Sequence, residues 1–481
     1  MAVLSREFKP EPDSELFDPE TGMCSIEYYA SCKDPYRVAS NKIPVGWPWL
    51  CARASEAAND LNDQLYERIQ KVLSDYNISG WANNYNFAPR YTPEDAHDIY
   101  LIRTRDKFNA SWWRKAADEI YNDIIEPAAT AVGIEMTVEI WNEDKMYRDA
   151  SSLITDDAII NSIAKIQPAV LGTVMEHCPM KWTSIAYHNR GPPSNGSEQK
   201  LTVIVFIRPG EVHAWGELED NIIHAITSSS FPNELDIHVE ILPGELSLTR
   251  PTGRPLYHGI DNLPTIPSPG ASIAPSNCTD AAGTLGAVVN YRAAPTEEVK
   301  RCFLTSYDVI ASGDPDGKEL NDVRGIGLNK REVGFKIDVE YPSKYDPDHA
   351  RRSLKTRLQK NEEYYKHYME GVKHYDDIAA LGPIGQVKFA SGYRLSDTNH
   401  RMDWALVELD PARPAKNLLP SDTSFFRSGF LHNLPGYIVQ DGDTVSGTCT
   451  SISNTPNFYA KVGRTSGVTP AQYSPLKRAI A

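Results

Sequence analysis

The sequence predicts a multidomain protein in which an α/β domain is followed by an all-β domain. The chain has 481 residues, about three times the usual length of a single domain, so at least two domains are expected. Helical and β-branched apolar patterns alternate in the first half, whereas short apolar runs between turn residues fill the second half. Between the two, residues 248–280 are rich in proline, glycine and serine and predict a linker.

The first part of the chain predicts an irregular segment and then helices. Residues 1–45 are polar and rich in proline, so we predict a mostly irregular segment there, and the α/β domain follows over residues 46–247. Its first helix is indicated by apolar residues at four-residue spacing, which share one helical face: Leu61, Leu65, Ile69 and Leu73. The neighbouring predictions are a helix at 111–131 capped by Ser111, a strand at 137–141 and a helix at 156–164.

The strongest pattern of the α/β domain lies near its end. Residues 201–210 form an apolar, β-branched run that ends in Pro-Gly, which predicts a buried strand. Helical spacing follows at 216–229, and a second strand pattern at 234–244 also ends in Pro-Gly. A strand, a helix and a strand in such a short stretch predict a βαβ or α+β unit with helices covering the sheet.

The C-terminal domain, residues 281–481, is predicted to be rich in β-strands. Short apolar runs with turn residues between them predict strands at 283–293, 299–310, 384–394, 402–409, 436–448 and 457–467. A helical insertion is predicted near 348–377, where apolar and aromatic residues recur at helical intervals on a charged background: Leu354, Leu358, Tyr365 and Tyr368.

The net charge and the absence of a signal-like segment indicate which partners and which compartment to expect. The chain carries 49 Lys and Arg against 64 Asp and Glu, a formal net charge of −15. An acidic surface repels phosphate backbones and anionic lipids, so we expect neither nucleic acid nor a membrane as partner of the whole protein, although a local basic patch is compatible with this balance. The start of the chain does not resemble a secretory signal, and no apolar stretch reaches roughly eighteen residues, so we expect a cytoplasmic protein.

Cysteine and histidine spacing predicts neither disulfides nor a metal site. The seven cysteines are irregularly spaced, and the closest pair, Cys24 and Cys32, lacks CxxC spacing, so we expect free thiols. His177, Cys178 and His188 match no metal or Cys–His arrangement, and we expect them to pack in the core. Because glycine-rich phosphate loops are missing as well, we expect no cofactor.

Five segments of the C-terminal domain resemble the fungal trypsin-like family of the chymotrypsin fold. GTLGAVV, FLTSYDVI, IGQVKFASGYR, DWALVEL and KVGRTSG occur in the strand order of that family, over residues 281–469. The resemblance implies a serine endopeptidase fold with two β-barrels. Few strands can be placed after Asn417, so the second barrel is expected to be incomplete.

The resemblance also implies where catalytic residues would lie. Asp308 in LTSYDVI occupies the position of the catalytic histidine, and Asp403 in DWALVEL matches the aspartate that orients it. A carboxylate is a weak base toward a serine hydroxyl and cannot bridge nucleophile and aspartate as an imidazole does. Two facing carboxylates would also be costly to keep ionised. The alternative for Asp403 is a capping or turn aspartate at the start of a strand.

No nucleophile is predicted. The family carries its serine in a Gly-Asp-Ser-Gly loop downstream of KVGRTSG, and that motif and Gly-x-Ser-x-Gly are both missing from the 481 residues. Ser466 in RTSG lacks the flanking acidic residue and is not expected to act as one. The histidines between the two aspartates do not replace the base: His349, His367, His374 and His400.

These observations leave three functional hypotheses. The first is a catalytically inactive, protease-like protein that acts by interaction with a protein or peptide partner. The second is a serine endopeptidase whose nucleophile region is missing from this chain. The third is peptide or ligand binding by the N-terminal α/β domain. The sequence does not predict the oligomeric state.

Overall fold

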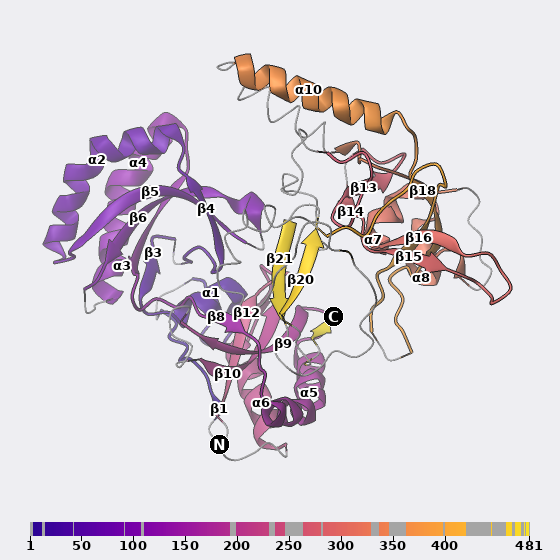
Figure 1. Cartoon of the computed structure of the whole chain (residues 1–481). Helices are drawn as coiled ribbons and strands as arrows, with labels where there is room; N and C mark the ends of the chain where they lie inside the picture. Colours follow the sequence, from indigo (N-terminus) through magenta and orange to yellow (C-terminus); the bar gives the residue numbers. More distant parts are fainter. Residues whose placement is uncertain are drawn as a thin grey trace. The chain divides into compact units, whose positions relative to one another are not determined.

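The computed structural model divides the chain into two compact units, Met1–Leu246 with Ser474–Ala481, and Ser247–Tyr473. Each unit has its own sheets and its own apolar core (Figure 1). The structure describes residues 3–11, 15–41, 43–90, 92–106, 110–192, 199–229, 236–245, 263–279, 282–328, 336–345, 362–397, 400–419, 444, 458–463, 467–472, 476 and 478–480.

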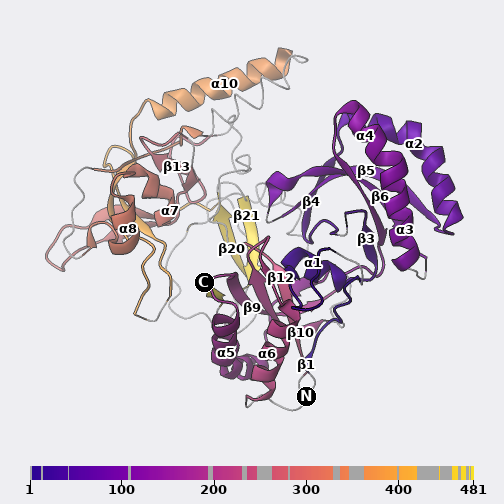
Figure 2. The same ribbon diagram turned by 180° about the vertical axis from the view of Figure 1, so that it is seen from behind.

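The N-terminal unit begins with a module of strands and helices in one sheet. Its elements are β4 (Trp49–Arg53), α2 (Glu56–Asp75), β5 (Gly80–Pro89), β6 (His97–Thr104), α3 (Ala110–Ile120), a π-helical turn (Tyr121–Ile125), α4 (Glu126–Val132) and β7 (Met136–Asn142). The sheet has the order β3-β7-β6-β5-β4, where β3 spans Arg37–Ala39. β6 and β7 are parallel and the other neighbours are antiparallel. The helices cover one face of this sheet and share its core (Figure 2).

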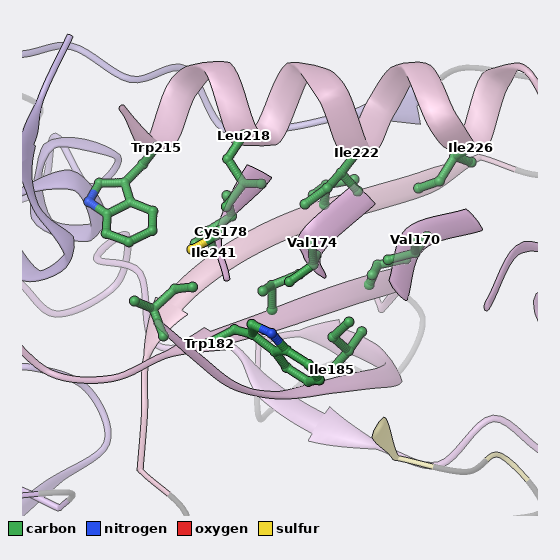
Figure 3. Close-up of a cluster of buried hydrophobic side chains, with 14 of the residues drawn as sticks. Val170, Val174, Cys178, Trp182, Ile185, Trp215, Leu218, Ile222, Ile226 and Ile241 are labelled. Atoms are coloured by element: carbon green, nitrogen blue, oxygen red, sulfur yellow. The ribbon is translucent and has the colours of Figure 1, made fainter. Parts of the chain in front are cut away.

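A second module of the same unit repeats this order around another sheet. Its elements are β8 (Ala150–Ser152), α5 (Asp157–His177), β9 (Trp182–Gly191), β10 (Lys200–Ile207), α6 (Trp215–Thr227) and β12 (Ile237–Pro243). The sheet order is β1-β12-β10-β9-β22, with β8 also paired to β9. β9 and β10 are antiparallel, and β10 and β12 are parallel. Figure 3 shows the apolar side chains of α6 pointing toward the sheet, beside Val170 and Val174 of α5.

The two modules match in spacing as well as in order. β4 and β8 begin at residues 49 and 150, α2 and α5 at 56 and 157, and β7 and β12 at 136 and 237, a separation of 101 residues in each of these three pairs. The other three pairs, β5 with β9, β6 with β10 and α3 with α6, begin 102, 103 and 105 residues apart. Buried positions follow the same separation, because Leu65 and Ile69 of α2 correspond to Ile166 and Val170 of α5. The N-terminal unit is therefore an internal structural repeat.

Several sequence predictions for this unit are confirmed. α2 buries the four predicted apolar residues, and the Ser55 side chain caps it by accepting the N–H of Ala58. The predicted strand, helix and strand of residues 201–244 are β10, α6 and β12, with the two strands parallel. Ser111 lies inside α3 and does not precede it, so the cap predicted there is wrong.

The prediction of an irregular segment over residues 1–45 is wrong in part. This stretch contains β1 (Val3–Leu4), β2 (Cys24–Ser25), α1 (Ile26–Cys32) and β3. The Ser25 side chain caps α1, and Ile26, Tyr28 and Tyr29 are buried. Three buried residues in a helix of seven residues are too few to produce a visible periodicity.

Residues near the end of the chain belong to the N-terminal unit. β22 (Ala479–Ile480) pairs antiparallel with Ile185 and Ser184 of β9. The Arg478 guanidinium donates to the Ser184 hydroxyl at 2.6 Å. The predicted C-terminal domain over 281–481 therefore differs from the structural unit, which ends before this strand.

The C-terminal unit is built on an antiparallel sheet that curls on itself. Its strands are β13 (Ser272–Pro275), β14 (Gly283–Thr284), β15 (Val288–Tyr291), β16 (Lys300–Thr305), β17 (Asp338–Glu340), β18 (Gly385–Ala390) and β19 (Ala405–Leu409). The order is β14-β13-β17-β18-β19-β16-β15. β14 and β15 lie at opposite ends of this order but are only three residues apart in the chain, so the two ends of the sheet meet. Gly286, in this joining segment, lets the backbone approach Leu304, whose carbonyl oxygen would lie 2.6 Å from an added Cβ.

Other predictions for this unit are modified by the structure. β13 forms within the predicted linker, and residues 307–310 of the predicted strand 299–310 are helical. The predicted insertion is represented by α10 (Glu362–Ala379), whereas Leu354 and Leu358 lie outside the described residues. The predicted strand 457–467 is part of a hairpin of β20 (Phe458–Gly463) and β21 (Gly467–Gln472). Of the predicted strand 436–448, only Thr444 is described.

One helix among the described residues, α5, is long and apolar enough to cross a membrane. Ile163, Ile166, Val170 and Val174 of this helix are completely buried against the second sheet.

Candidate functional site

Two strand ends of the C-terminal unit bring together the residues that the family resemblance implies. β16 ends at Thr305, and the short helix α7 (Tyr307–Ile310) starts two residues later and contains Asp308. Asp403 precedes β19, which pairs antiparallel with β16 so that Thr305 lies opposite Ala405. This pairing places Asp308 and Asp403 side by side.

The two aspartates are joined through the backbone. The N–H of Asp308 donates to Oδ1 of Asp403 at 3.0 Å. The Ser306 side chain, which precedes α7, makes no capping hydrogen bond to this helix. Asp403, which lies just before β19, instead accepts the backbone N–H of Asp308 in the first turn of α7 and so acts as its cap. Among the hydrogen bonds of the described residues, none joins the two carboxyl groups. The contact between the two residues is therefore one from a backbone N–H to a carboxylate oxygen.

Two tyrosines complete the surroundings of Asp308. The Tyr393 hydroxyl donates to Oδ1 of Asp308 at 2.6 Å, and the Tyr307 hydroxyl donates to Oδ1 of Asp322 at 2.7 Å. The two rings pack edge to face with centroids 5.0 Å apart. Burial, followed by the hydrogen bond to a carboxylate, raises the pKa of both tyrosines above the ordinary value. Both hydroxyls therefore remain donors at neutral pH.

Positive charge lies near this pair of tyrosines but does not reach the aspartates. The Arg401 guanidinium lies 4.6 Å from the centroid of the Tyr393 ring, and Lys318 lies 5.7 Å from it. Lys318 Nζ is ion-paired with Asp322 at 2.6 Å. Within the described part of the chain, Asp308 and Asp403 take part in no ion pair. Among the described residues, the hydrogen bonds to these two carboxylates come from a backbone N–H and a tyrosine hydroxyl, and no histidine takes part in them.

The remaining sequence candidates are dispersed. Ser466 and His349 lie outside the described residues, as does the side chain of His367. His374 Nε2 donates to the carbonyl oxygen of Leu263 at 2.9 Å, which is a structural role in α10. His400 is exposed, and the backbone N–H of this residue donates to the Ser396 hydroxyl.

Of the N-terminal candidates, Cys178 is buried in the core, whereas His177 is exposed at the end of α5, so the prediction that His177 packs in the core is wrong. Cys178 is buried among the residues shown in Figure 3, and burial raises the pKa of its thiol to about 11. Burial lowers the pKa of His188, which lies on β9. The six cysteines of the described ranges are free thiols. No group of three or more metal-ligating side chains occurs in the part of the chain that the structure describes.

We expect Tyr393→Phe to destabilise the C-terminal unit by about 1–2 kcal/mol, because it removes a hydrogen bond to an ionised carboxylate. Native-state hydrogen exchange of the β16 and β19 amides measures this change. Tyr291→Phe is the control, since that ring also contacts an aromatic neighbour, Phe389 at 5.3 Å, without a hydroxyl hydrogen bond among the described residues. Equal protection in both variants would contradict the role assigned to Tyr393.

Sequence patterns indicated the two aspartates but not the tyrosines around them. Tyr393 lies in a turn after β18, and no spacing rule connects it with Asp308 at 85 positions' separation. Neither a scan against protein-family models nor a search of curated proteins finds a match for this chain.

Proposed function

We propose that this protein acts by binding a protein or peptide partner and not by cleaving peptide bonds. In this proposal the C-terminal unit is a trypsin-like barrel without catalytic activity. Three features support the likeness: an antiparallel sheet that curls on itself, a short helix directly after β16, and Asp403 directly before β19. The adjacency of Asp308 and Asp403 supports it further, because a catalytic triad requires its base and its orienting aspartate to be neighbours.

The proposal that the protein does not cleave peptide bonds depends mainly on Asp308. Its carboxylate can only accept hydrogen bonds when ionised, and Oδ1 already accepts one from Tyr393. An ionised carboxylate is too weak a base to deprotonate a serine hydroxyl efficiently near neutral pH. Nor can it donate to Asp403 while accepting from a nucleophile, which is what the imidazole of a triad does.

A fluorophosphonate probe tests this proposal on the full chain. We expect no covalent labelling detectable by intact-protein mass spectrometry, under conditions in which an active trypsin-like enzyme is labelled stoichiometrically. A stoichiometric adduct on the folded chain would overturn the proposal and favour the serine endopeptidase alternative.

The substitution Asp308→His adds a second arm to this experiment. An imidazole at position 308 would lie beside Asp403 and could be oriented by it. None of the serines in the 481 residues lies in a Gly-Asp-Ser-Gly or Gly-x-Ser-x-Gly setting, so we expect this variant to remain unlabelled as well. Labelling gained by Asp308→His would show that a competent nucleophile is present and that only the base is missing.

A further inference from the structure

A pocket of about 390 Å³ lies between the two modules of the N-terminal unit. Its walls come from the end of α1, the segment before β4, the connection from β7 to β8, and the ends of β10 and β12. Most of the lining is apolar and includes Pro44, Val45, Trp47, Phe206 and Leu242. A pocket of this size and character is suited to a small molecule or to one or two residues of a peptide.

Asp34 contributes a buried negative charge to this pocket. The residue is 7% exposed and lies in the pocket wall. Its Oδ1 accepts the N–H of Tyr36 at 3.0 Å and its Oδ2 accepts the N–H of Tyr147 at 2.6 Å. No ion pair among the described residues includes Asp34. Burial raises the pKa of Asp34, and the nearby guanidiniums of Arg37 and Arg6 oppose that shift without forming an ion pair with it among the described residues.

The cations of the pocket wall are already neutralised by other carboxylates. The Arg37 guanidinium donates to Glu139 at 2.8 Å and to the Val45 carbonyl at 2.9 Å, and both Arg37 and Glu139 are buried. Arg190 pairs in the same way with Glu240 at 2.9 Å. Arg37 lies close enough to lower the pKa of Asp34, but its guanidinium is ion-paired with Glu139, so it compensates the charge of Asp34 only in part.

The remaining charges of the wall do not change this balance. Asp149 is paired with Arg6 at 2.9 Å, and Glu27 is ionisable but accepts a backbone N–H from Gly210 at 2.8 Å. The lining residues include three carboxyl groups, of Glu27, Asp34 and Asp149, and two guanidiniums, of Arg37 and Arg190. This excess of one carboxyl group favours a cation over a carboxylate or a phosphate.

Aromatic rings provide the apolar side of the pocket. Trp47, Tyr147 and Phe206 line it, and Trp47 packs edge to face on Trp49 with centroids 4.4 Å apart. Two of these rings already contact cations of the chain, because the guanidinium of Arg6 lies 3.7 Å from the Tyr147 centroid and that of Arg478 lies 4.9 Å from the Phe206 centroid. Among the described residues no such cation lies over Trp47, and an aromatic face attracts organic cations and also buries an apolar body. We propose that this pocket binds an organic cation, a primary ammonium group on an apolar body, with the ammonium at Asp34 and the apolar body against Trp47. A free amine and the amino terminus of an apolar peptide share this chemistry.

A matched ligand series tests the proposal on the unaltered full chain. Isothermal titration calorimetry with phenethylamine, 2-phenylethanol and 3-phenylpropionate compares a cation, a neutral molecule and an anion of similar shape. We expect the amine to bind at least about tenfold more tightly than the alcohol, and the propionate most weakly, because only the amine makes a charge-assisted hydrogen bond. Equal binding of amine and alcohol, tighter binding of the propionate, or no binding of any of the three would overturn the proposal.

Two peptides distinguish the sources of the cation. Phe-Leu amide carries a free amino terminus, and its N-acetylated form lacks the positive charge but keeps the apolar body. Tighter binding of the free peptide than of phenethylamine assigns the pocket to peptide termini, whereas the reverse order assigns it to small amines. Equal binding of the free and acetylated peptides would contradict a role for the charge.

Variants locate the binding site. Asp34→Asn removes the charge and keeps one acceptor oxygen, and we expect it to abolish the preference for amine over alcohol. Glu27→Gln removes another carboxylate of the wall and should leave at least part of that preference, while Trp47→Ala should weaken amine and alcohol alike. Folding of each variant is checked by circular dichroism. A folded Asp34→Asn chain with unchanged amine preference would overturn the proposal, and the ligand series on the unaltered chain decides it if that variant does not fold. The C-terminal labelling experiment is independent of all these outcomes.

Discussion

We expect the substitution Lys33→Met to lower the free energy of unfolding of the N-terminal unit by about 3–5 kcal/mol. Lys33 is ion-paired with Glu219 of α6, and both side chains are 6% exposed. The Tyr29 hydroxyl donates to the same carboxylate, and the Lys33 ammonium lies 4.5 Å from the centroid of the Tyr29 ring. Removing the lysine leaves a buried carboxylate without its cation, and the loss of solvation of that charge is the main cost.

Denaturant unfolding followed by tryptophan fluorescence measures this loss, because eight of the nine tryptophans lie in the N-terminal unit and only Trp404 lies in the other. Lys9→Met is the matched control, since Lys9 pairs with Glu7 on the surface, where ion pairs contribute less than about 1 kcal/mol. In the double variant Lys33→Met with Glu219→Leu both charges are gone, and we expect most of the stability to return. A single variant Lys33→Met as stable as the control would contradict the importance of this pair.

A loss of similar size, about 3–5 kcal/mol, is expected for Trp215→Ala. Trp215 begins α6 and is completely buried in the core shown in Figure 3. Its indole N–H donates to the carbonyl oxygen of Cys24 at 2.8 Å, so the substitution also leaves a buried acceptor without its donor. Truncation creates a large cavity at the junction of α6 with the segment before α1.

Trp112→Ala is the comparison for this variant, because Trp112 is 49% exposed. We expect a change within about 1 kcal/mol for that substitution in the same unfolding experiment. For Trp215→Phe we expect a loss of stability between those of Trp215→Ala and Trp112→Ala, because the phenyl ring fills part of the space but cannot donate a hydrogen bond to Cys24. An unfolding midpoint of Trp215→Ala close to that of Trp112→Ala would show that the core relaxes into the space left by the indole.

The sequence predicted the elements whose burial is one-sided and regular. α2 exposes one polar face and buries Leu61, Leu65, Ile69 and Leu73, so its period is visible in the residue types. β5 was not predicted, because asparagines at 83, 84 and 86 interrupt the alternation of a strand that pairs on both sides. The internal repeat was also missed. Equivalent positions share apolar character and not identity, as Leu65 and Ile166 do.

For the candidate sites too, the sequence indicated some of the residues but not the contacts between them. The resemblance indicated that Asp308 and Asp403 are neighbours, but it could not indicate that their link is a backbone N–H to a carboxylate. No sequence pattern indicated Asp34 as a binding residue. Its carboxyl group is held by the backbone N–H of Tyr147, more than a hundred residues away, and the neighbouring Arg37 is ion-paired with Glu139. Burial and charge compensation of this kind arise only when the chain is folded.

β22 makes the N-terminal unit discontinuous in sequence, with the C-terminal unit inserted between its two parts. A recombinant fragment that stopped at residue 246 would lack the strand beside Ser184 and Ile185, and the β9 backbone there would present unpaired N–H and C=O groups. Such an open edge recruits strands from other molecules, so this fragment would tend to self-associate. A circularly permuted gene that places residues 474–481 ahead of residue 1 would supply the missing strand within the same polypeptide, provided that a flexible linker joins the two, because β22 and β1 lie at opposite edges of the sheet.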